Sequence, residues 1–153
     1  MSKINERYGP QTELALDTWV KLARAFSTFN KKTSENIRAF GLTLPQFSVI
    51  EALGHKGPLK VGEICEKMLV SGGNMTLVLD NLEKHNLVER VHSREDRRAI
   101  IIRLTKEGEE LFNKIFGEHA EYISNLMSVL SEDEQKKLGG ILKKLGKSVK
   151  GTK

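Results

Sequence analysis

The stretch from Val61 to Gly108 constrains the fold more than any other part of the chain. It contains a helical hydrophobic period, a turn and a second helical period, followed by two strand-like runs around a basic loop. Helix, turn, helix and basic hairpin in this order are the parts of a winged helix-turn-helix, a unit that reads DNA. The sequence therefore predicts a mainly α fold with a small β-wing.

The second helix of this stretch has an apolar stripe and an unusual opposite face. Met75, Val78, Leu79 and Leu82 recur at i, i+3, i+4 and i+7. The opposite face is mostly uncharged, and its Asn and Thr side chains can read base edges while its Leu can meet a thymine methyl. A hydroxyl at the helix start can cap it, and two glycines there allow close approach to a phosphate. The residues predicted to contact DNA from this helix are Ser71, Gly73, Asn74, Thr76, Leu77 and Asn81. The alternative is a loosely started surface helix.

The hairpin that follows places arginines between two short apolar strands. The runs Leu87–His92 and Ala99–Leu104 are rich in β-branched and apolar residues. The polar loop between them holds Arg94, Arg97 and Arg98. A wing of this kind can place Arg97 or Arg98 in a minor groove beside the helix site, so all three arginines are predicted to contact DNA.

Three motifs in this region resemble the signature of MarR-type transcriptional regulators. They are Leu82-Glu83 near the end of the second helix, Asp96-Arg97-Arg98 in the loop, and the run Leu104–Gly108 that reads L-T-x-x-G. Asn86 stands where this family usually has Gly, and Asn also tolerates the left-handed backbone that ends helices. Leu77 stands where the family often has Arg, which leaves the base contacts and the operator sequence open.

The resemblance implies further properties, which we write as expectations. It implies a short strand between residues 57 and 61 and a two-fold homodimer whose terminal helices interlock. It also implies a cleft for a small aromatic or phenolic effector between the DNA-binding part and the dimer helices. The candidates to line that cleft are Trp19, Phe26, Phe47 and His55; plain core is the ordinary role for each, and cleft lining is the alternative.

The remaining chain predicts long helices on both sides of this unit. A helical pattern over residues 12–40 ends at Gly41, and Thr43 is expected to cap the next helix, whose first turn tolerates Pro45. A short helix, Val61–Met68, is expected to bury Val61, Ile64, Cys65 and Met68.

After Gly108, a wide apolar band predicts another long helix. Ser131 and Glu134 then form a capping box for a last helix, with a frayed basic tail over Lys147–Lys153. We predict one domain, 1–153, with a winged helix-turn-helix over 43–108. The helices over 12–40 and 109–149 are more apolar than the small centre can cover, which indicates dimerisation; the alternative is that they form the monomer's own core.

Composition limits the class of protein. The chain has 153 residues, a net charge of +5 and a single cysteine, which excludes an intramolecular disulfide and suits a reducing cytosol. The N-terminus has no apolar run typical of a signal peptide, and no segment approaches the length of a membrane span. We therefore expect a cytoplasmic protein that does not bind membranes, and the basic charge suits double-stranded DNA.

The sequence predicts neither a catalytic nor a cofactor or metal site. The four histidines and the cysteine share no metal-ligand spacing, and no phosphate loop, nucleophile elbow or carboxylate pair is recognisable. Some MarR-type regulators sense oxidants through cysteine, but a buried Cys65 with no basic neighbour on its own face is a poor candidate. The predicted function is a ligand-responsive repressor that binds a pseudo-palindromic operator. The alternative is an architectural nucleic-acid-binding protein that is indifferent to sequence.

Overall fold

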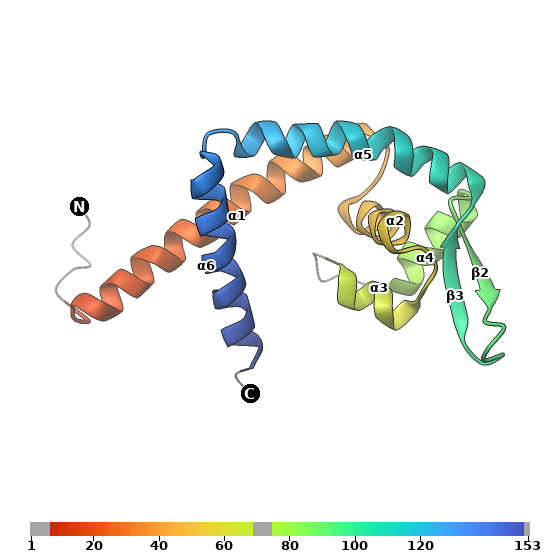
Figure 1. The fold of residues 1–153 in the computed structure, drawn as a ribbon, viewed down its shortest axis with the longest axis horizontal. Helices are drawn as coiled ribbons and strands as arrows, with labels where there is room; N and C mark the ends of the chain where they lie inside the picture. Colours follow the sequence, from red (N-terminus) through yellow and green to blue (C-terminus); the bar gives the residue numbers. More distant parts are fainter. Residues whose placement is uncertain (1–6, 69–74, 152–153) are drawn as a thin grey trace. The chain divides into compact units, whose positions relative to one another are not determined.

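The computed structural model describes residues 7–68 and 75–151 (Figure 1). The chain divides into two compact units, Met1–Glu109 and Glu110–Lys153, which we describe separately. The elements in chain order are α1 Pro10–Ala39, α2 Leu44–Lys56, β1 Leu59–Lys60, α3 Val61–Lys67, α4 Met75–Lys84, β2 Val88–His92, β3 Ile100–Leu104, α5 Lys106–Met127 and α6 Glu132–Lys150. The mainly α fold with a small β-wing is confirmed.

The start of α2 is determined by a capping box. The Gln46 N–H donates to Thr43 Oγ1 at 3.3 Å, and the Thr43 N–H donates to Gln46 Oε1 at 3.0 Å. Pro45 lies in the first turn, where no backbone hydrogen bond is lost, and Gly57 ends the helix at a φ of +76°. The predictions for Thr43 and Pro45 are confirmed.

The three strands form one antiparallel sheet in the order β1-β3-β2. The short strand β1 is the one that the family resemblance implied. On the central strand β3, Ile102 lies opposite Leu59 on one side and Arg90 on the other, and its side chain is fully buried. Ile100, two residues nearer the loop, is exposed, so burial along this face of β3 decreases toward the tip of the hairpin.

The first unit has one core, which is shared by its helices and its sheet. The buried apolar residues come from the end of α1, from α2, α3 and α4, and from the sheet. They are Ile37, Leu42, Phe47, Val49, Ile50, Ala52, Leu53, Ile64, Leu79, Leu82, Val88 and Ile102.

The prediction for the inward face of α3 was largely wrong. Ile64 is buried, but Val61 and Cys65 are exposed and Met68, just past the helix, is half-buried. This helix of 7 residues packs on α2, β1 and β3 along the line that contains Ile64. Val61 and Cys65 lie four residues apart on its flank, so the helical period alone predicted a wider buried face than the helix has. Because Cys65 is exposed, burial is no longer a reason to exclude it from reaction with oxidants.

Close contacts join the end of α4 to the start of α5. Asn86 has a φ of +56°, as predicted, and its carbonyl accepts a hydrogen bond from the Thr105 hydroxyl at 2.6 Å. Thr105 caps α5 by accepting from the Gly108 N–H at 3.0 Å, and its own N–H donates to the Leu87 carbonyl at 3.1 Å. A Cβ on Gly108 would lie 2.0 Å from the Leu87 carbonyl oxygen. The L-T-x-x-G run therefore holds three chain segments together.

The second unit contains the rest of α5 and the helix α6. Ile115 is buried in α5, and the rings of Phe112 and Phe116 stack at 5.3 Å. The Ser131 capping box is confirmed, because Glu134 N–H donates to Ser131 Oγ at 3.2 Å and the reciprocal bond is also present. Helix α6 continues to Lys150, inside the basic tail that was predicted to fray; residues 152–153 of that tail lie outside the described residues, and the fraying stays a prediction.

Candidate nucleic-acid interface

Helix α4 buries its apolar stripe and turns its other face to solvent. Leu79 and Leu82 are buried against the core, and Met75 and Val78 are half-buried. Thr76 and Leu77 lie on the opposite side, and Leu77 is 56% exposed. A large apolar side chain that is exposed on a well-packed helix is available for contact with a partner.

The other residues predicted to contact DNA from this helix differ in what the structure says of them. Ser71, Gly73 and Asn74 lie outside the described residues. Asn81 is half-buried, one turn before the helix ends, and the His85 ring nitrogen Nδ1 lies 2.7 Å from its backbone carbonyl. Base contact by any of these residues stays a prediction.

The loop between β2 and β3 has a defined backbone. The buried Ser93 hydroxyl accepts from the N–H groups of Glu95 and Asp96 at 3.2 and 3.4 Å. Asp96 Oδ1 in turn accepts from the Arg98 N–H at 3.0 Å. These local bonds use short polar side chains to shape a turn, which leaves the arginine side chains outside it.

The three loop arginines present their charge to solvent. Arg94, Arg97 and Arg98 are all exposed, and within the described part of the chain no carboxylate forms an ion pair with any of them. Arg94 and Arg97 line an open hollow together with His92 and Ser93. Unpaired guanidinium groups on a protruding hairpin are suited to bind phosphate or a narrow minor groove.

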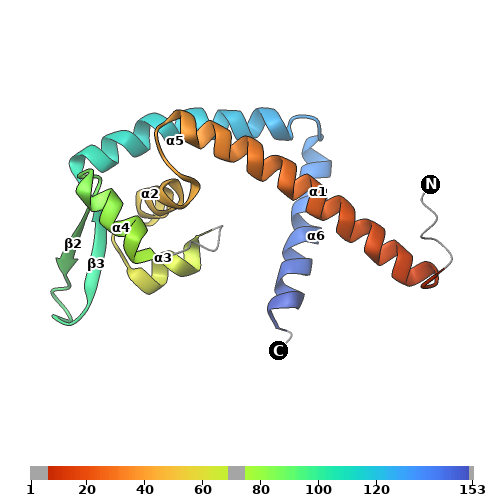
Figure 2. The same cartoon turned by 180° about the vertical axis from the view of Figure 1, so that it is seen from behind.

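Arg90 connects the hairpin to α4 by two ion pairs. Its Nη2 lies 2.7 Å from Asp80 Oδ1, and its Nη1 lies 2.8 Å from Glu83 Oε1. The hydrogen bond that Arg90 donates to Asp80 raises the pKa of the Arg90 guanidinium above its usual value, and the nearby Glu83 adds to this. Helix α4 contacts β2, and Figure 2 shows the two elements next to each other.

Arg90 was not among the residues predicted from the sequence to take part in the DNA-binding site. The available signal was the pair of acids Asp80 and Glu83, three residues apart on one flank of a helix, followed by an isolated arginine in the next strand. Connecting them required the angle between helix and strand, which no periodicity gives.

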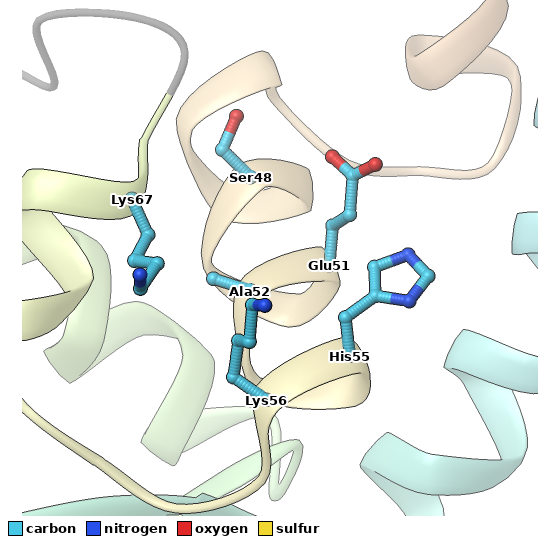
Figure 3. Close-up of a pocket in the computed structure, with 6 residues that line it drawn as sticks. All are labelled: Ser48, Glu51, Ala52, His55, Lys56 and Lys67. Atoms are coloured by element: carbon cyan, nitrogen blue, oxygen red, sulfur yellow. The ribbon is translucent and has the colours of Figure 1, made fainter.

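A second hollow lies between α2 and α3 (Figure 3). It has a volume of about 210 Å³, and its lining includes both acidic and basic groups. Burial raises the pKa of the Glu51 carboxyl, and the nearby His55 opposes this shift in part. The lining residues are Ser48, Glu51, Ala52, His55, Lys56 and Lys67.

Of the four residues expected to line an effector cleft, only His55 is in that hollow. Phe47 is 2% exposed and belongs to the core of the first unit. Trp19 and Phe26 are 63% and 64% exposed on α1 and do not line it. Their contact with an effector stays a prediction.

The described part of the chain contains neither a candidate metal site nor a membrane-spanning helix. No group of three or more His, Cys, Asp or Glu side chains there is arranged to hold a metal ion. Among the same residues, no helix combines the length and apolar character needed to cross a membrane.

Known proteins resemble this chain both in the helix-turn-helix region and over most of its length. Residues 42–100, from α2 to the start of β3, match the MarR family model. The chain is 37% identical over 139 residues to the HTH-type transcriptional regulator MhqR of Bacillus subtilis, which covers 91% of this chain and 96% of MhqR. It is 32% identical to the HTH-type transcriptional repressor MdtR of Bacillus subtilis, over 89% of this chain and 88% of MdtR.

A solved structure agrees with these relatives. The MepR-like protein complexed with pseudoligands is 32% identical, has a TM-score of 0.63, and is covered over 90% of this chain and 97% of that one. The resemblance first seen in the Asp96-Arg97-Arg98 loop and the L-T-x-x-G run thus extends over nearly the whole chain. The chain belongs to the MarR family.

Proposed function

We propose that this protein is a transcriptional regulator that binds DNA sequence-specifically as a homodimer and is released by a small effector. One observation carries the proposal: burial of Leu79 and Leu82 turns Thr76 and Leu77 outward on α4, beside a hairpin with three exposed arginines. A helix with readable side chains next to a basic wing is the arrangement that DNA-reading winged helices use. Its relatives MhqR and MdtR are named as transcriptional regulators, the latter a repressor.

The two parts of the site divide the task of recognition. Side chains on the outward face of α4 would enter the major groove and contact base edges. The arginines of the loop would contact phosphates or the flanking minor groove, which adds affinity for every sequence. The net charge of +5 favours approach to DNA in general.

Exposed apolar side chains on the terminal helices support a homodimer. On α1, Leu14, Trp19 and Phe26 are exposed, and on α6 Ile141 and Val149 are exposed. Each would gain about 25 cal/mol for every Å² of apolar surface that a partner covers. A two-fold dimer would set two α4 helices about one turn of DNA apart, so the operator would be pseudo-palindromic.

The hollow between α2 and α3 supports a small-molecule effector. It offers a carboxyl at Glu51, the His55 ring and the ammonium groups of Lys56 and Lys67, all of which can bind the polar end of an aromatic or phenolic ligand. The MepR-like protein, 32% identical to this chain, was solved in complex with pseudoligands, which supports the proposal of a ligand here. Its relatives MhqR and MdtR are from Bacillus subtilis, and a regulator in such a cell would meet its DNA in the cytoplasm, where we propose that this protein acts.

Selection of bound duplexes from a random DNA pool tests the proposal. We expect enrichment of one pseudo-palindromic motif, and release of the selected duplex when a member of a panel of phenols is added. An unenriched pool that nevertheless binds the protein would instead identify a sequence-indifferent architectural protein. Enrichment of a motif without release by any phenol would support a sequence-specific regulator and exclude phenols as its effectors.

A further inference from the structure

We infer that Arg90 is a positioning residue for base reading: it fixes the rotation of α4 against the wing and so sets sequence selectivity rather than overall affinity. This inference rests on the proposed DNA-binding function. Arg90 lies on β2 and reaches α4 through Asp80 and Glu83, at 2.7 and 2.8 Å.

The geometry of these contacts resists rolling of the helix. The stripe of α4, with Leu79 and Leu82 buried, packs one side of the helix on the core. Asp80 and Glu83 are three residues apart, so they lie one turn apart on one flank, away from that stripe. Asp80 is also three residues after Leu77 and four after Thr76, so a shift at Asp80 moves the face predicted to read bases.

The charges indicate a role other than phosphate binding. Arg90 is shared between two carboxylates, and its side chain is 28% exposed, whereas the loop arginines are exposed and unpaired. Two acids beside a DNA-facing surface weaken attraction to phosphate. Exposed ion pairs also add little to folding stability, so orientation is the property that this arrangement can supply.

Arg103 provides a matched control in the same sheet. It lies on β3 and pairs with Glu89 of β2 across the strands, with Nε 2.5 Å from Glu89 Oε1. Its loss removes the same charge and an ion pair of the same kind, but the ion pair with Glu89 does not involve α4.

The experiment measures affinity for a duplex selected from a random pool by the wild-type protein, and for its scrambled version, at one salt concentration. We expect Arg90→Gln to lower the ratio of the two affinities about tenfold, the order of one lost base-pair contact. The double variant Asp80→Asn/Glu83→Gln should lower the ratio similarly, although it makes the protein more positive. Arg103→Gln should keep the ratio of the wild type.

Two results would overturn the inference. The first is tighter binding of both duplexes by Asp80→Asn/Glu83→Gln with an unchanged ratio, which would mean that the acids only repel DNA. The second is an equal loss on both duplexes for Arg90→Gln and Arg103→Gln, which would make Arg90 an ordinary cation. If Arg90→Gln does not fold, as judged by circular dichroism, Arg90→Lys replaces it; lysine lacks the fork that reaches both acids, so a smaller loss of ratio is expected and an unchanged ratio refutes the inference.

These outcomes separate the inference from the proposed function. A wild-type protein that prefers no duplex refutes the proposed function, and the inference with it. A wild type that discriminates, with variants that do so equally well, refutes the inference alone.

Discussion

Among the described glycines, Gly108 leaves the least room for a side chain. A methyl group there would lie 2.0 Å from the Leu87 carbonyl oxygen and 3.0 Å from its carbon, and both are backbone atoms. Relief of this clash would move the junction of α4, β2 and α5. We expect Gly108→Ala to lower the free energy of unfolding by about 1–3 kcal/mol, as overpacking typically does.

Urea unfolding followed by circular dichroism checks this value. Gly117→Ala is the control, because Gly117 also lies in α5 and a Cβ there meets nothing within 4 Å. That change should stabilise the helix by up to about 1 kcal/mol. Equal effects of the two substitutions would contradict the packing argument.

Among the described residues of α4, Leu77 is a candidate for direct contact with a base. Its side chain is 56% exposed, so truncation costs little core packing, but it would remove an apolar contact to a thymine methyl. We expect Leu77→Ala to change the half-site selected from a random pool while affinity for random DNA changes little. The control is Val129→Ala, an exposed apolar truncation outside α4. A selected motif identical to that of the wild type would remove Leu77 from the reading face.

At the scale of elements, the wing determines affinity through its arginines. We expect Arg97→Ala to weaken binding to selected and scrambled duplexes alike, because a phosphate contact is independent of sequence. The slope of log affinity against log salt should fall in magnitude by about one unit. Titrations at several salt concentrations measure it, with Arg103→Ala as the control. An unchanged slope and affinity would exclude Arg97 from the interface.

Local signals predicted the elements well. The Thr43 and Ser131 capping boxes, the left-handed Asn86 and the two strands of the hairpin each depend on residues within a few positions of one another. Such features follow from backbone sterics and side-chain hydrogen bonds that a sequence displays directly.

Tertiary arrangement explains what the sequence did not predict. The helical period of Val61–Met68 cannot tell which of two adjacent lines faces the core, and packing on the sheet chose the one through Ile64. The contact of Arg90 with Asp80 spans ten positions and depends on the crossing of a strand with a helix. The effector cleft was inferred mainly from aromatic residues, whereas His55 is the one member of that set among the described residues that line the hollow between α2 and α3.

At the scale of the whole molecule, the exposed apolar faces of α1 and α6 predict a dimer. We expect sedimentation at micromolar concentration to give twice the chain mass of 17.2 kDa. Ile141→Glu places a charge on the apolar side of α6 and should shift the equilibrium toward monomer. Lys143→Glu, on the other side of the same helix, should not. A compact wild-type monomer would show that these faces have another use.

The most direct test of the account measures binding to a duplex with two selected half-sites and to one with about five base pairs inserted between them. The insertion turns one half-site to the opposite side of the DNA, where a rigid two-fold dimer cannot reach both. We expect affinity to fall toward that for scrambled DNA, although the half-site sequences are unchanged. Equal affinity for the two duplexes would contradict binding of an operator by a symmetric dimer.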